Sequence, residues 1–410
     1  MSGKLHFTGI GGAGMAPLAE LALARGCRVS GSDELDSPKC RRLAALGAKI
    51  VIGHRPENLP SDAGLLVYSS AVPEGNCERV RARELGIREV RRGEYLAEFA
   101  GHYRRCVPVT GSHGKSSITA ALVRILRRCG MDPGFMIGAE VGDMPCCGAG
   151  DGDIFVTEAD ESDGTHTLTE NFLAVIPNVE DDHEWSLGGR EVLERNFRTV
   201  AENSRTVLYF ASAKCDELFA GHPGAVRLPA VPEHFAGSYG FQAANAFIAA
   251  RAAVLLGCDE DAAVAAAADY PAVARRMTLH LQRENLTVIE DYAHHPTELR
   301  ASLSLLRRRF PGAHLRVLFQ PHRYARLAKY FDEFAEILRE PESCFIAPVF
   351  AAWSEGGARD AAALARAAGA RLVTGSYAEW AALLLADLPE KSVIAVLGAG
   401  DVNGVLPYLK

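Results

Sequence analysis

The chain has 410 residues, which is too long for one ordinary hydrophobic core and predicts two or three domains. Hydrophobic residues make up 48% and charged residues 23%, as in ordinary globular proteins, and the net charge of -7 argues against a nucleic-acid partner. The ten cysteines lack metal-ligand spacing, the N-terminus resembles no signal peptide, and charges interrupt the alanine-rich stretch 243–268, so we expect a cytoplasmic protein with reduced thiols and no membrane insertion.

Short apolar runs alternate with amphipathic helical stretches along the whole chain, which predicts α/β architecture with mainly parallel sheets. The expected strands, in chain order, are Leu5–Thr8, Leu65–Tyr68, Cys106–Val109, Ile154–Thr157, Leu173–Ile176, Thr287–Ile289, Leu315–Phe319 and Val393–Leu397. The clearest helices are expected at Lys115–Arg128 and Glu191–Asn203. Polar stretches near residues 101–105 and 272–276 suggest three domains, with bounds 1–103, 104–273 and 274–410.

The first predicted strand leads into a glycine loop with the pattern G-x-G-x-x-G, which reads Gly9-Ile10-Gly11-Gly12-Ala13-Gly14-Met15. Glycines let backbone amides approach a diphosphate closely, and the following helix adds positive partial charge. Asp33 stands where a nicotinamide enzyme carries its ribose-binding acid. The pattern alone is weak, since tight strand–helix packing can also select glycines, and its context favours a phosphate-bearing ligand.

A second loop, Gly111-Ser112-His113-Gly114-Lys115-Ser116-Ser117, follows a predicted strand and opens a predicted helix. Its G-x-x-G-K-S core is far more specific than the first pattern. Lys115 is placed to reach the outer phosphates of a nucleotide, and the Ser116 hydroxyl to bind Mg²⁺. The loop therefore predicts a nucleoside triphosphate site, and two phosphate loops in succession fit an enzyme that holds ATP and a nucleotide-linked substrate.

Polar clusters follow the later strands at their carboxyl ends, where α/β sheets bind ligands. Glu158-Ala159-Asp160-Glu161-Ser162-Asp163 follows one strand and suits a metal that bridges phosphates, although a solvated acidic loop is the alternative. Asn178 and Asp182-His183 follow the next strand, and His183 is a candidate second metal ligand.

Three further polar clusters follow predicted strands in the last third of the chain. They are residues 290–298 (EDYAHHPTE), residues 320–326 (QPHRYAR) and the turn 398–401 (GAGD). Arg323 and Arg326 are three residues apart, so on one helical turn they would share a face and clamp a carboxylate with forked hydrogen bonds.

Taken together, the ordered motifs GIGGAGM, GSHGKSS, EADESD, the stretch from Asn178 to His183, EDYAHHPTE, FQPHRYAR and GAGD resemble the Mur ligase family over nearly the whole chain. The closest likeness is to members that join L-alanine to UDP-N-acetylmuramic acid with ATP and Mg²⁺. The resemblance implies a Rossmann-like N-terminal domain for the UDP substrate, a P-loop ATPase-like central domain, and a Rossmann-like C-terminal domain for the amino acid. We expect the chain to act as a monomer or homodimer.

The resemblance also implies a role for individual residues of this chain. The UDP substrate would contact Gly9, Gly11, Gly12, Ala13, Gly14, Met15, Asp33, Ser69 and Ser70. ATP would contact Gly111, Ser112, His113, Gly114, Lys115, Ser116, Ser117, Asn245 and Asp291, with metal ions on Ser116, Glu158 and His183. The amino acid would contact Tyr292, His294, Arg323 and Arg326, and the catalytic residues would be Lys115, His183, His294 and Arg323.

Some features depart from the family pattern. The region from Arg205 to Gly240 is shorter than usual. Tyr239-Gly240-Phe241-Gln242 replaces a glycine–x–histidine–asparagine stretch, which leaves only Asn245 and Ala246 of the family's pattern. Three alternatives stay open: a recycling ligase that attaches a tripeptide to the same substrate, an NAD-dependent oxidoreductase, which the first loop and Asp33 would fit, and a non-catalytic nucleotide-binding relative, which the shortened centre would fit.

Overall fold

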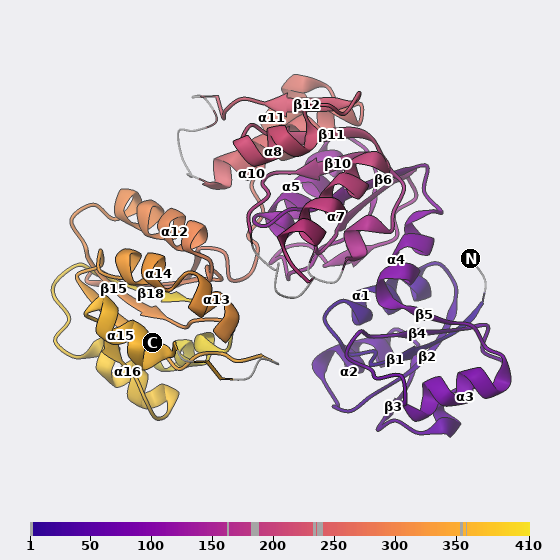
Figure 1. Ribbon diagram of the computed structural model, residues 1–410, viewed down its shortest axis with the longest axis horizontal. Helices are drawn as coiled ribbons and strands as arrows, with labels where there is room; N and C mark the ends of the chain where they lie inside the picture. The colour runs from indigo at the N-terminus through magenta and orange to yellow at the C-terminus, as the bar shows by residue number, and fades with distance from the viewer. Residues whose placement is uncertain are drawn as a thin grey trace. The chain divides into compact units, whose positions relative to one another are not determined.

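The computed structural model describes residues 3–161, 164–181, 188–232, 235, 241–352, 356–357 and 359–410. The chain forms two compact units. Their helices and strands are labelled in Figure 1. The first unit comprises residues 1–235 and 242–271, and the second comprises residues 236–241 and 272–410.

The first unit begins with a five-stranded parallel sheet in the order β3-β2-β1-β4-β5. Its strands are β1 Lys4–Thr8, β2 Arg28–Asp33, β3 Lys49–Ile52, β4 Leu65–Tyr68 and β5 Glu89–Arg91. The connecting helices are α1 Met15–Ala24, α2 Pro38–Ala45, α3 Cys77–Leu85 and α4 Arg92–Ala100, with a short 3-10 turn η1 at Pro56–Asn58. Because β1 is the central strand, the glycine loop that follows it leaves the middle of the sheet edge.

A seven-stranded sheet follows in the same unit, in the order β12-β11-β10-β6-β9-β7-β8, and only the β7–β8 pair is antiparallel. Its strands are β6 Arg105–Val109, β7 Gly134–Met136, β8 Cys147–Gly148, β9 Ile154–Glu158, β10 Asn171–Ile176, β11 Ser204–Phe210 and β12 Ala225–Leu228. The helical elements are α5 Lys115–Arg128, η2 Thr165–Thr167, α7 Arg190–Glu202, α8 Ala213–Phe219, α10 Phe241–Leu255 and α11 Glu260–Ala267.

One hydrophobic cluster spans the first sheet and the β7, β8 and β9 strands of the second, while β10, β11, α7 and α8 pack around a cluster of their own. The ring of Phe155 on β9 lies 5.4 Å from Phe99 of α4 and 5.0 Å from Tyr103, centroid to centroid. The guanidinium of Arg25 donates hydrogen bonds of 2.7 Å to the Tyr103 hydroxyl and 3.0 Å to the backbone oxygen of Ala149. Aromatic packing and the half-buried Arg25 thus tie the end of α1 to the second sheet.

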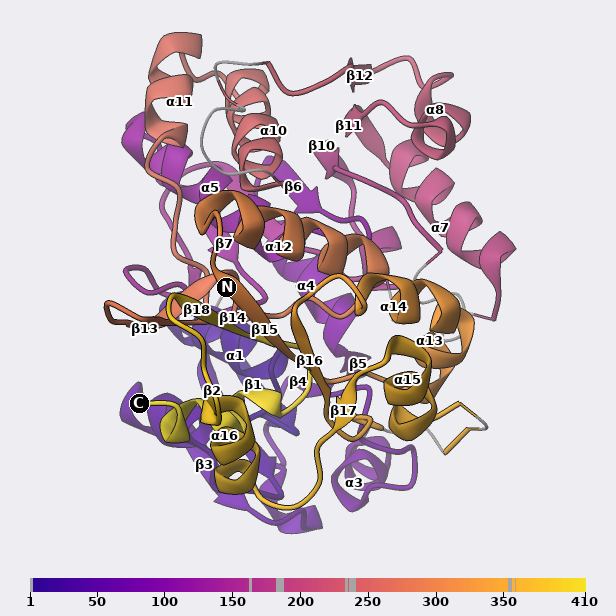
Figure 2. The same cartoon turned by 90° about the vertical axis from the view of Figure 1, so that its left-hand side faces the viewer.

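The second unit is a six-stranded sheet in the order β13-β14-β18-β15-β16-β17, with only β13 antiparallel to its neighbour. Its strands are β13 Thr278–Gln282, β14 Leu286–Asp291, β15 His314–Phe319, β16 Ser343–Ile346, β17 Arg371–Leu372 and β18 Ser392–Leu397. The helical elements are α12 Pro296–Arg309, α13 Tyr324–Lys329, α14 Phe331–Ile337, α15 Ala361–Ala368, α16 Tyr377–Leu385 and η3 Val402–Tyr408. Helices α12, α14 and α15 pack on one face, while α16 and η3 cover the other (Figure 2).

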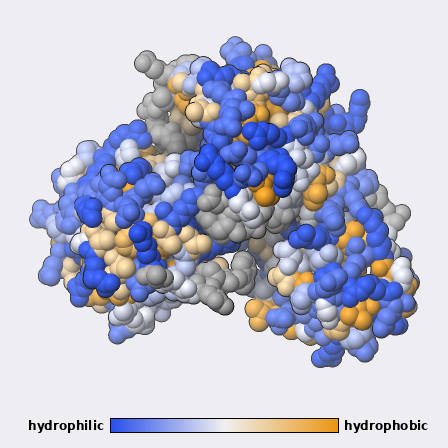
Figure 3. Space-filling view, viewed as in Figure 1, coloured by the Kyte–Doolittle hydropathy of each residue, from blue (hydrophilic) through white to orange (hydrophobic). Residues whose placement is uncertain are grey.

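The α/β fold class and every predicted strand and helix are confirmed, and α5 has the predicted bounds. The central strands are buried on both faces, so they read as continuous apolar runs. No helix within the described residues is long and apolar enough to span a membrane. Each of the ten cysteines, all of them described, is a free thiol. Hydrophilic residues predominate on the face shown in Figure 3.

Candidate functional site

The first glycine loop is fastened to the strand exits on both sides of β1. The amides of Gly9 and Ile10 donate to the backbone oxygen of Ser32, at 2.8 and 3.0 Å. Gly9 has a φ of +79°, and a Cβ there would lie 3.2 Å from the Cβ of Ser69, which follows β4. The structure therefore brings the predicted residues Gly9 and Ser69 together, with Ser70 exposed beside them.

Asp33, at the end of β2, holds this loop directly. Its Oδ2 accepts a 2.8 Å hydrogen bond from the amide of Gly11, and its Oδ1 accepts one of 3.1 Å from Leu35. A Cβ at position 11 would lie only 3.0 Å from that Oδ2 and 2.8 Å from the sulfur of Cys40, so the close approach requires glycine. Both carboxylate oxygens of Asp33 thus accept backbone amides, and its contact with a ligand stays a prediction.

Arg92 is a cation beside the glycine loop that the sequence analysis missed. A Cβ on Gly14 would lie 2.9 Å from Cδ and 3.2 Å from Nη1 of Arg92. The guanidinium also donates a 3.1 Å hydrogen bond to the hydroxyl of Thr165, just beyond the acidic stretch that follows β9. Arg92 begins α4 immediately after β5, so the strand-exit rule that selected the other candidates also applies to it.

The second glycine loop joins β6 to α5, and its backbone is clamped by Asn178. The amide of His113 donates a 2.8 Å hydrogen bond to Asn178 Oδ1, and Asn178 Nδ2 donates one of 3.2 Å to the carbonyl of His113. The amide of Ser112 donates 3.2 Å to the Asn178 backbone oxygen. Gly111, at φ +123°, leaves no room for a Cβ, which would lie 2.6 Å from that oxygen.

Helix α5 begins at Lys115, so the first-turn amides of Lys115, Ser116 and Ser117 have no acceptor within the helix. The preceding residue, Gly114, has a φ of +87°, and a Cβ there would lie 2.7 Å from Asn245 Oδ1 of α10. The structure therefore places Asn245 against the second glycine loop, and its contact with ATP stays a prediction. Of the replaced stretch before it, Tyr239 and Gly240 lie outside the described residues.

The ammonium of Lys115 lies among the acids that follow β9. It donates to both carboxylate oxygens of Glu161, at 2.8 and 3.1 Å, and to the Gly111 carbonyl at 2.8 Å. Burial would lower the pKa of Lys115, but Glu161, Asp160 and Glu158 together raise it, so the side chain stays charged. The Oε2 of Glu158 also accepts a 2.8 Å hydrogen bond from the Gly138 amide.

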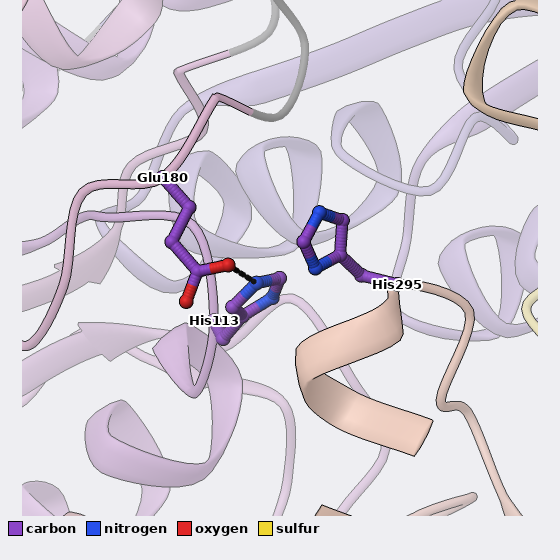
Figure 4. A group of neighbouring side chains, drawn as sticks. All are labelled: His113, Glu180 and His295. Carbon is purple, nitrogen blue, oxygen red and sulfur yellow. Dashed lines mark hydrogen bonds and ion pairs between the residues drawn. The ribbon is translucent and has the colours of Figure 1, made fainter. Parts of the chain in front are cut away.

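Glu180 is a second residue that the sequence analysis missed, and it contacts two residues of the loop. Its Oε2 lies 3.3 Å from Nε2 of His113 (Figure 4). Its amide donates 2.8 Å to the hydroxyl of Ser112. His183, the expected second metal ligand, lies outside the described residues, as do Ser162, Asp163 and Asp182. His295, also labelled in Figure 4, belongs to the second unit, where it precedes α12 and accepts from the amide of Thr297.

In the second unit, Asp291 ends β14 and is 2% exposed. Its Oδ2 accepts 2.7 Å from the amide of Met277, while Oδ1 accepts 2.9 Å from the amide of Ala293 and 3.2 Å from the hydroxyl of Ser302. Burial raises the pKa of Asp291 to about 6, against the opposing effect of Arg276. Asp291 therefore fixes the backbone on both sides of the strand exit, and its predicted ATP contact is untested.

Two of the residues predicted to bind the amino acid, Tyr292 and His294, lie in a row of aromatic rings at this strand exit. Tyr292 meets His294 edge-on at 5.4 Å, and His294 meets His322 edge-on at 5.6 Å. His322 stacks on Phe350 at 5.5 Å. Arg275 lies 4.9 Å from the Tyr292 ring and donates 2.7 Å to the Gly398 carbonyl, so the GAGD turn closes the same edge.

The expectation that Arg323 and Arg326 lie on one helical turn is wrong. Helix α13 begins at Tyr324, and Arg323 precedes it with a φ of +68°, a strained conformation for a residue with a side chain. Its amide donates 2.8 Å to the Phe350 carbonyl, which draws residue 323 out of the helix. Arg326 is 1% exposed and donates to the His322 backbone oxygen at 3.1 Å. A role for either residue in binding an amino acid stays a prediction.

Two family models match the chain: "Mur ligase family, catalytic domain" over residues 4–104, and "Mur ligase, glutamate ligase domain" over residues 275–400. A UDP-N-acetylmuramate–L-alanine ligase of Paenarthrobacter aurescens is 35% identical, covering 99% of this chain and 96% of the relative. One of Myxococcus xanthus is 33% identical, covering 99% and 94%.

Two solved structures share the fold. A UDP-N-acetylmuramate–alanine ligase of Thermotoga maritima superposes with a TM-score of 0.80 at 22% identity, covering 99% of this chain and 98% of that one. A murein peptide ligase of Psychrobacter arcticus has a TM-score of 0.70 at 20% identity, with the same coverage. The sequence identities over nearly the full length establish that the chain belongs to the Mur ligase family.

Proposed function

We propose that this protein is a cytoplasmic ATP-dependent ligase that forms an amide bond between the lactyl carboxylate of UDP-N-acetylmuramic acid and L-alanine, in peptidoglycan precursor synthesis. The observation that carries the proposal is the loop at the start of α5, where Lys115 lies charged among the acids that follow β9. Full-length relatives with this activity in their names, at 33% and 35% identity, support the choice of substrates.

The residues of the α5 loop suit the triphosphate of ATP. Positions 111 and 114 have positive φ and no space for a Cβ, which is the close backbone approach that a phosphate loop needs. Ser116 and Glu158 carry the oxygen ligands that Mg²⁺ prefers. When bound, Mg²⁺ would neutralise charge on the phosphates. We assign a second metal contact to His183 on the family resemblance.

The proposed reaction has two steps. A carboxylate oxygen of the lactyl group attacks the γ-phosphorus of ATP, and the bond to the bridging oxygen breaks to release ADP. The amine of L-alanine then attacks the carbonyl carbon of this acyl phosphate; the C–O bond breaks, inorganic phosphate leaves, and the amine loses a proton to the medium. Lys115 stabilises the negative charge that develops on the transferred phosphoryl group.

We assign the UDP substrate to the first glycine loop, Gly9 to Met15, with Ser69 and Ser70 from the β4 exit. Arg92 is added to this set because its guanidinium lies beside Gly14, where it would pair with a diphosphate. The amino acid is assigned to Tyr292, His294, Arg323 and Arg326. The division into domains of residues 1–103, 104–273 and 274–410, and a monomeric or homodimeric state, are part of the same proposal.

The proposal is tested by phosphate release from ATP in the presence of UDP-N-acetylmuramate, with L-alanine, glycine, L-serine or a tripeptide as the acceptor. We expect release to depend on both substrates, with L-alanine giving the highest kcat/KM. A preference for the tripeptide would convert the proposal into the recycling ligase. Phosphate release that is independent of UDP-N-acetylmuramate would refute the substrate assignment.

A further inference from the structure

A buried carboxylate organises the edge of the N-terminal sheet next to the glycine loop. Glu78, the second residue of α3, is fully buried, and its side chain accepts five hydrogen bonds. The donors come from β1, β2 and the segment after β3, and they are His6 Nε2, Thr8 Oγ1, Ser32 Oγ, Asn58 Nδ2 and the amide of Arg55. The side-chain bonds from His6, Ser32 and Asn58 outweigh burial, which alone would raise the pKa of Glu78, and lower it to about 2. The carboxylate is therefore ionised and can only accept hydrogen bonds.

Ser32 connects this carboxylate to the glycine loop and to a histidine. Its backbone oxygen accepts the amides of Gly9 and Ile10. Its hydroxyl donates a 2.6 Å hydrogen bond to Glu78 and lies 2.8 Å from Nδ1 of His54, the second residue after β3. Ser32 thus contacts both His54 and the loop to which we assign the diphosphate.

The direction of these bonds fixes the chemistry that His54 offers. A serine hydroxyl has one proton, and that of Ser32 is committed to the ionised Glu78, so Ser32 must accept a hydrogen bond from Nδ1–H of His54. In the tautomer that carries its proton on Nδ1, the imidazole has a lone pair on Nε2. Nε2 has no partner among the described residues, and the side chain is 15% exposed.

The position of His54 selects the part of the ligand that it would meet. In a sheet with a glycine loop after its central strand, the nucleoside extends from the diphosphate toward the end of the next strand, here β2. The acid at that position, Asp33, already accepts two backbone amides. The exit of β3, adjacent to β2, presents His54 instead. A lone pair at this position can accept a hydrogen bond from a donor on the nucleoside. An ionised phosphate oxygen has no proton to donate, so it would not bind there.

We propose that His54 determines specificity for the nucleoside of the substrate, accepting at Nε2 a hydrogen bond from the uridine moiety, and that Ser32 and Glu78 are positioning residues for it. The inference rests on the proposed function. Uridine offers two kinds of donor, the imide N–H of the base and the ribose hydroxyls, and the experiment separates them.

The test uses isothermal titration of the full chain with UDP, N3-methyl-UDP and 2′-deoxy-UDP. In His54→Asn the side-chain amide replaces the Nδ1 donor to Ser32 but leaves nothing at the position of Nε2. We expect this variant to bind UDP about 5- to 10-fold more weakly, the loss of one hydrogen bond, with unchanged affinity for ATP. His102→Asn is the matched control and should bind UDP as the wild type does, because His102 is an exposed histidine of the same unit whose Nδ1 lies 2.8 Å from the Glu98 backbone oxygen of the preceding helix α4.

The analogues identify the donor. If it is the imide, the wild type binds N3-methyl-UDP more weakly than UDP while His54→Asn no longer discriminates; if it is a ribose hydroxyl, 2′-deoxy-UDP behaves in this way. Ser32→Ala should weaken UDP binding by itself, and the double variant Ser32→Ala/His54→Asn should be no weaker than His54→Asn. Full additivity would overturn the positioning role of Ser32.

Unchanged UDP affinity in His54→Asn, or retained discrimination against both analogues, would overturn the inference while leaving the proposed function intact, provided that the wild type binds UDP and releases phosphate. A wild type that does neither would overturn both. His54→Gln serves as the second variant: its amide reaches the position of Nε2, so it should recover part of the lost affinity, and a Gln variant as weak as Asn would count against hydrogen bonding there.

Discussion

Replacing Glu78 by glutamine should remove a large, pH-dependent contribution to the stability of the N-terminal sheet. The pKa of Glu78 falls from an ordinary 4.5 to about 2 in the folded chain, because hydrogen bonds from His6, Ser32 and Asn58 outweigh the cost of burial. Each pKa unit corresponds to about 1.4 kcal/mol, so the ionised carboxylate stabilises the fold by about 3 kcal/mol at neutral pH. Glutamine has the shape of the protonated acid and lacks this contribution.

The pH dependence has a defined sign. Since the folded-state pKa is lower than the unfolded value, the unfolded chain takes up the proton first as the pH falls. The stabilisation is complete above pH 4.5 and is lost progressively toward pH 2. The difference in unfolding free energy between the wild type and Glu78→Gln should therefore be greatest near neutral pH and should shrink between pH 4.5 and 2.

A domain-resolved assay is needed because a chain of several domains does not unfold in one step. Urea titrations at several pH values, each read by pulsed hydrogen exchange and mass spectrometry on peptides from β1 and α3, report the N-terminal sheet alone. Glu84→Gln, an exposed position of the same helix, is the matched control. The reasoning is refuted if both variants shift the midpoint equally at pH 7, or if the effect of Glu78→Gln does not change with pH.

Three further predictions concern other parts of the chain. Lys115→Met should abolish phosphate release in the coupled assay while UDP still binds, and normal turnover would remove the α5 loop from the mechanism. Gly93→Ala should lower the thermal midpoint by an amount equivalent to roughly 1–3 kcal/mol, because its Cβ would lie 2.5 Å from the hydroxyl oxygen of Thr165, and Thr165→Ala should restore it. Arg316→Met should destabilise the C-terminal sheet by roughly 2–4 kcal/mol in chemical denaturation, because the buried guanidinium donates hydrogen bonds to backbone oxygens at the end of α16. A change below about 0.5 kcal/mol would show that those oxygens find other donors.

The central strands could be predicted from the sequence, whereas strands with polar faces or at sheet edges could not. β18 is buried along its whole length and reads as an apolar run. β2 was not predicted because it reads RVSGSD, and the structure supplies the reason: Ser30 and Ser32 point to His6 and Glu78 instead of an apolar layer. β3 lies at the sheet edge, so its apolar side chains at 51 and 52 are partly exposed and its pattern gives no alternation.

Local motifs identified the loops, but the residues that hold them are distant in sequence. Glu161 lies 46 residues from the lysine that it pairs with, and Glu180 lies 67 residues from His113. Glu78 follows no strand and belongs to no motif, so nothing in its neighbourhood marks it as a buried carboxylate. The prediction for Arg323 and Arg326 was wrong because it assumed that both residues are helical. In the structure, His322 forms a β-bridge with Phe350, and the helix begins only at Tyr324, so Arg323 lies outside it.

The two glycine loops of the first unit are supported in the same way, and this bears on what they bind. Each follows the central strand of a parallel trio, β2-β1-β4 in one sheet and β10-β6-β9 in the other. In each trio one neighbouring strand fixes the loop backbone, through Asp33 on Gly11 and through Asn178 on His113. The other neighbour brings a polar side chain alongside, Ser69 in the first case and Glu161 in the second.

The difference between the two loops lies in charge. Beside the α5 loop, Lys115 is surrounded by acids, an arrangement that suits a cationic metal together with a polyphosphate. Beside the first loop stand Arg92 and the hydrogen-bonded pair Ser32 and His54, while Asp33 already accepts backbone amides. A nicotinamide enzyme needs that acid for its ribose. Under the proposed function, the side chains around the loops, more than the glycine spacing, favour a nucleotide-sugar over a dinucleotide at the first loop.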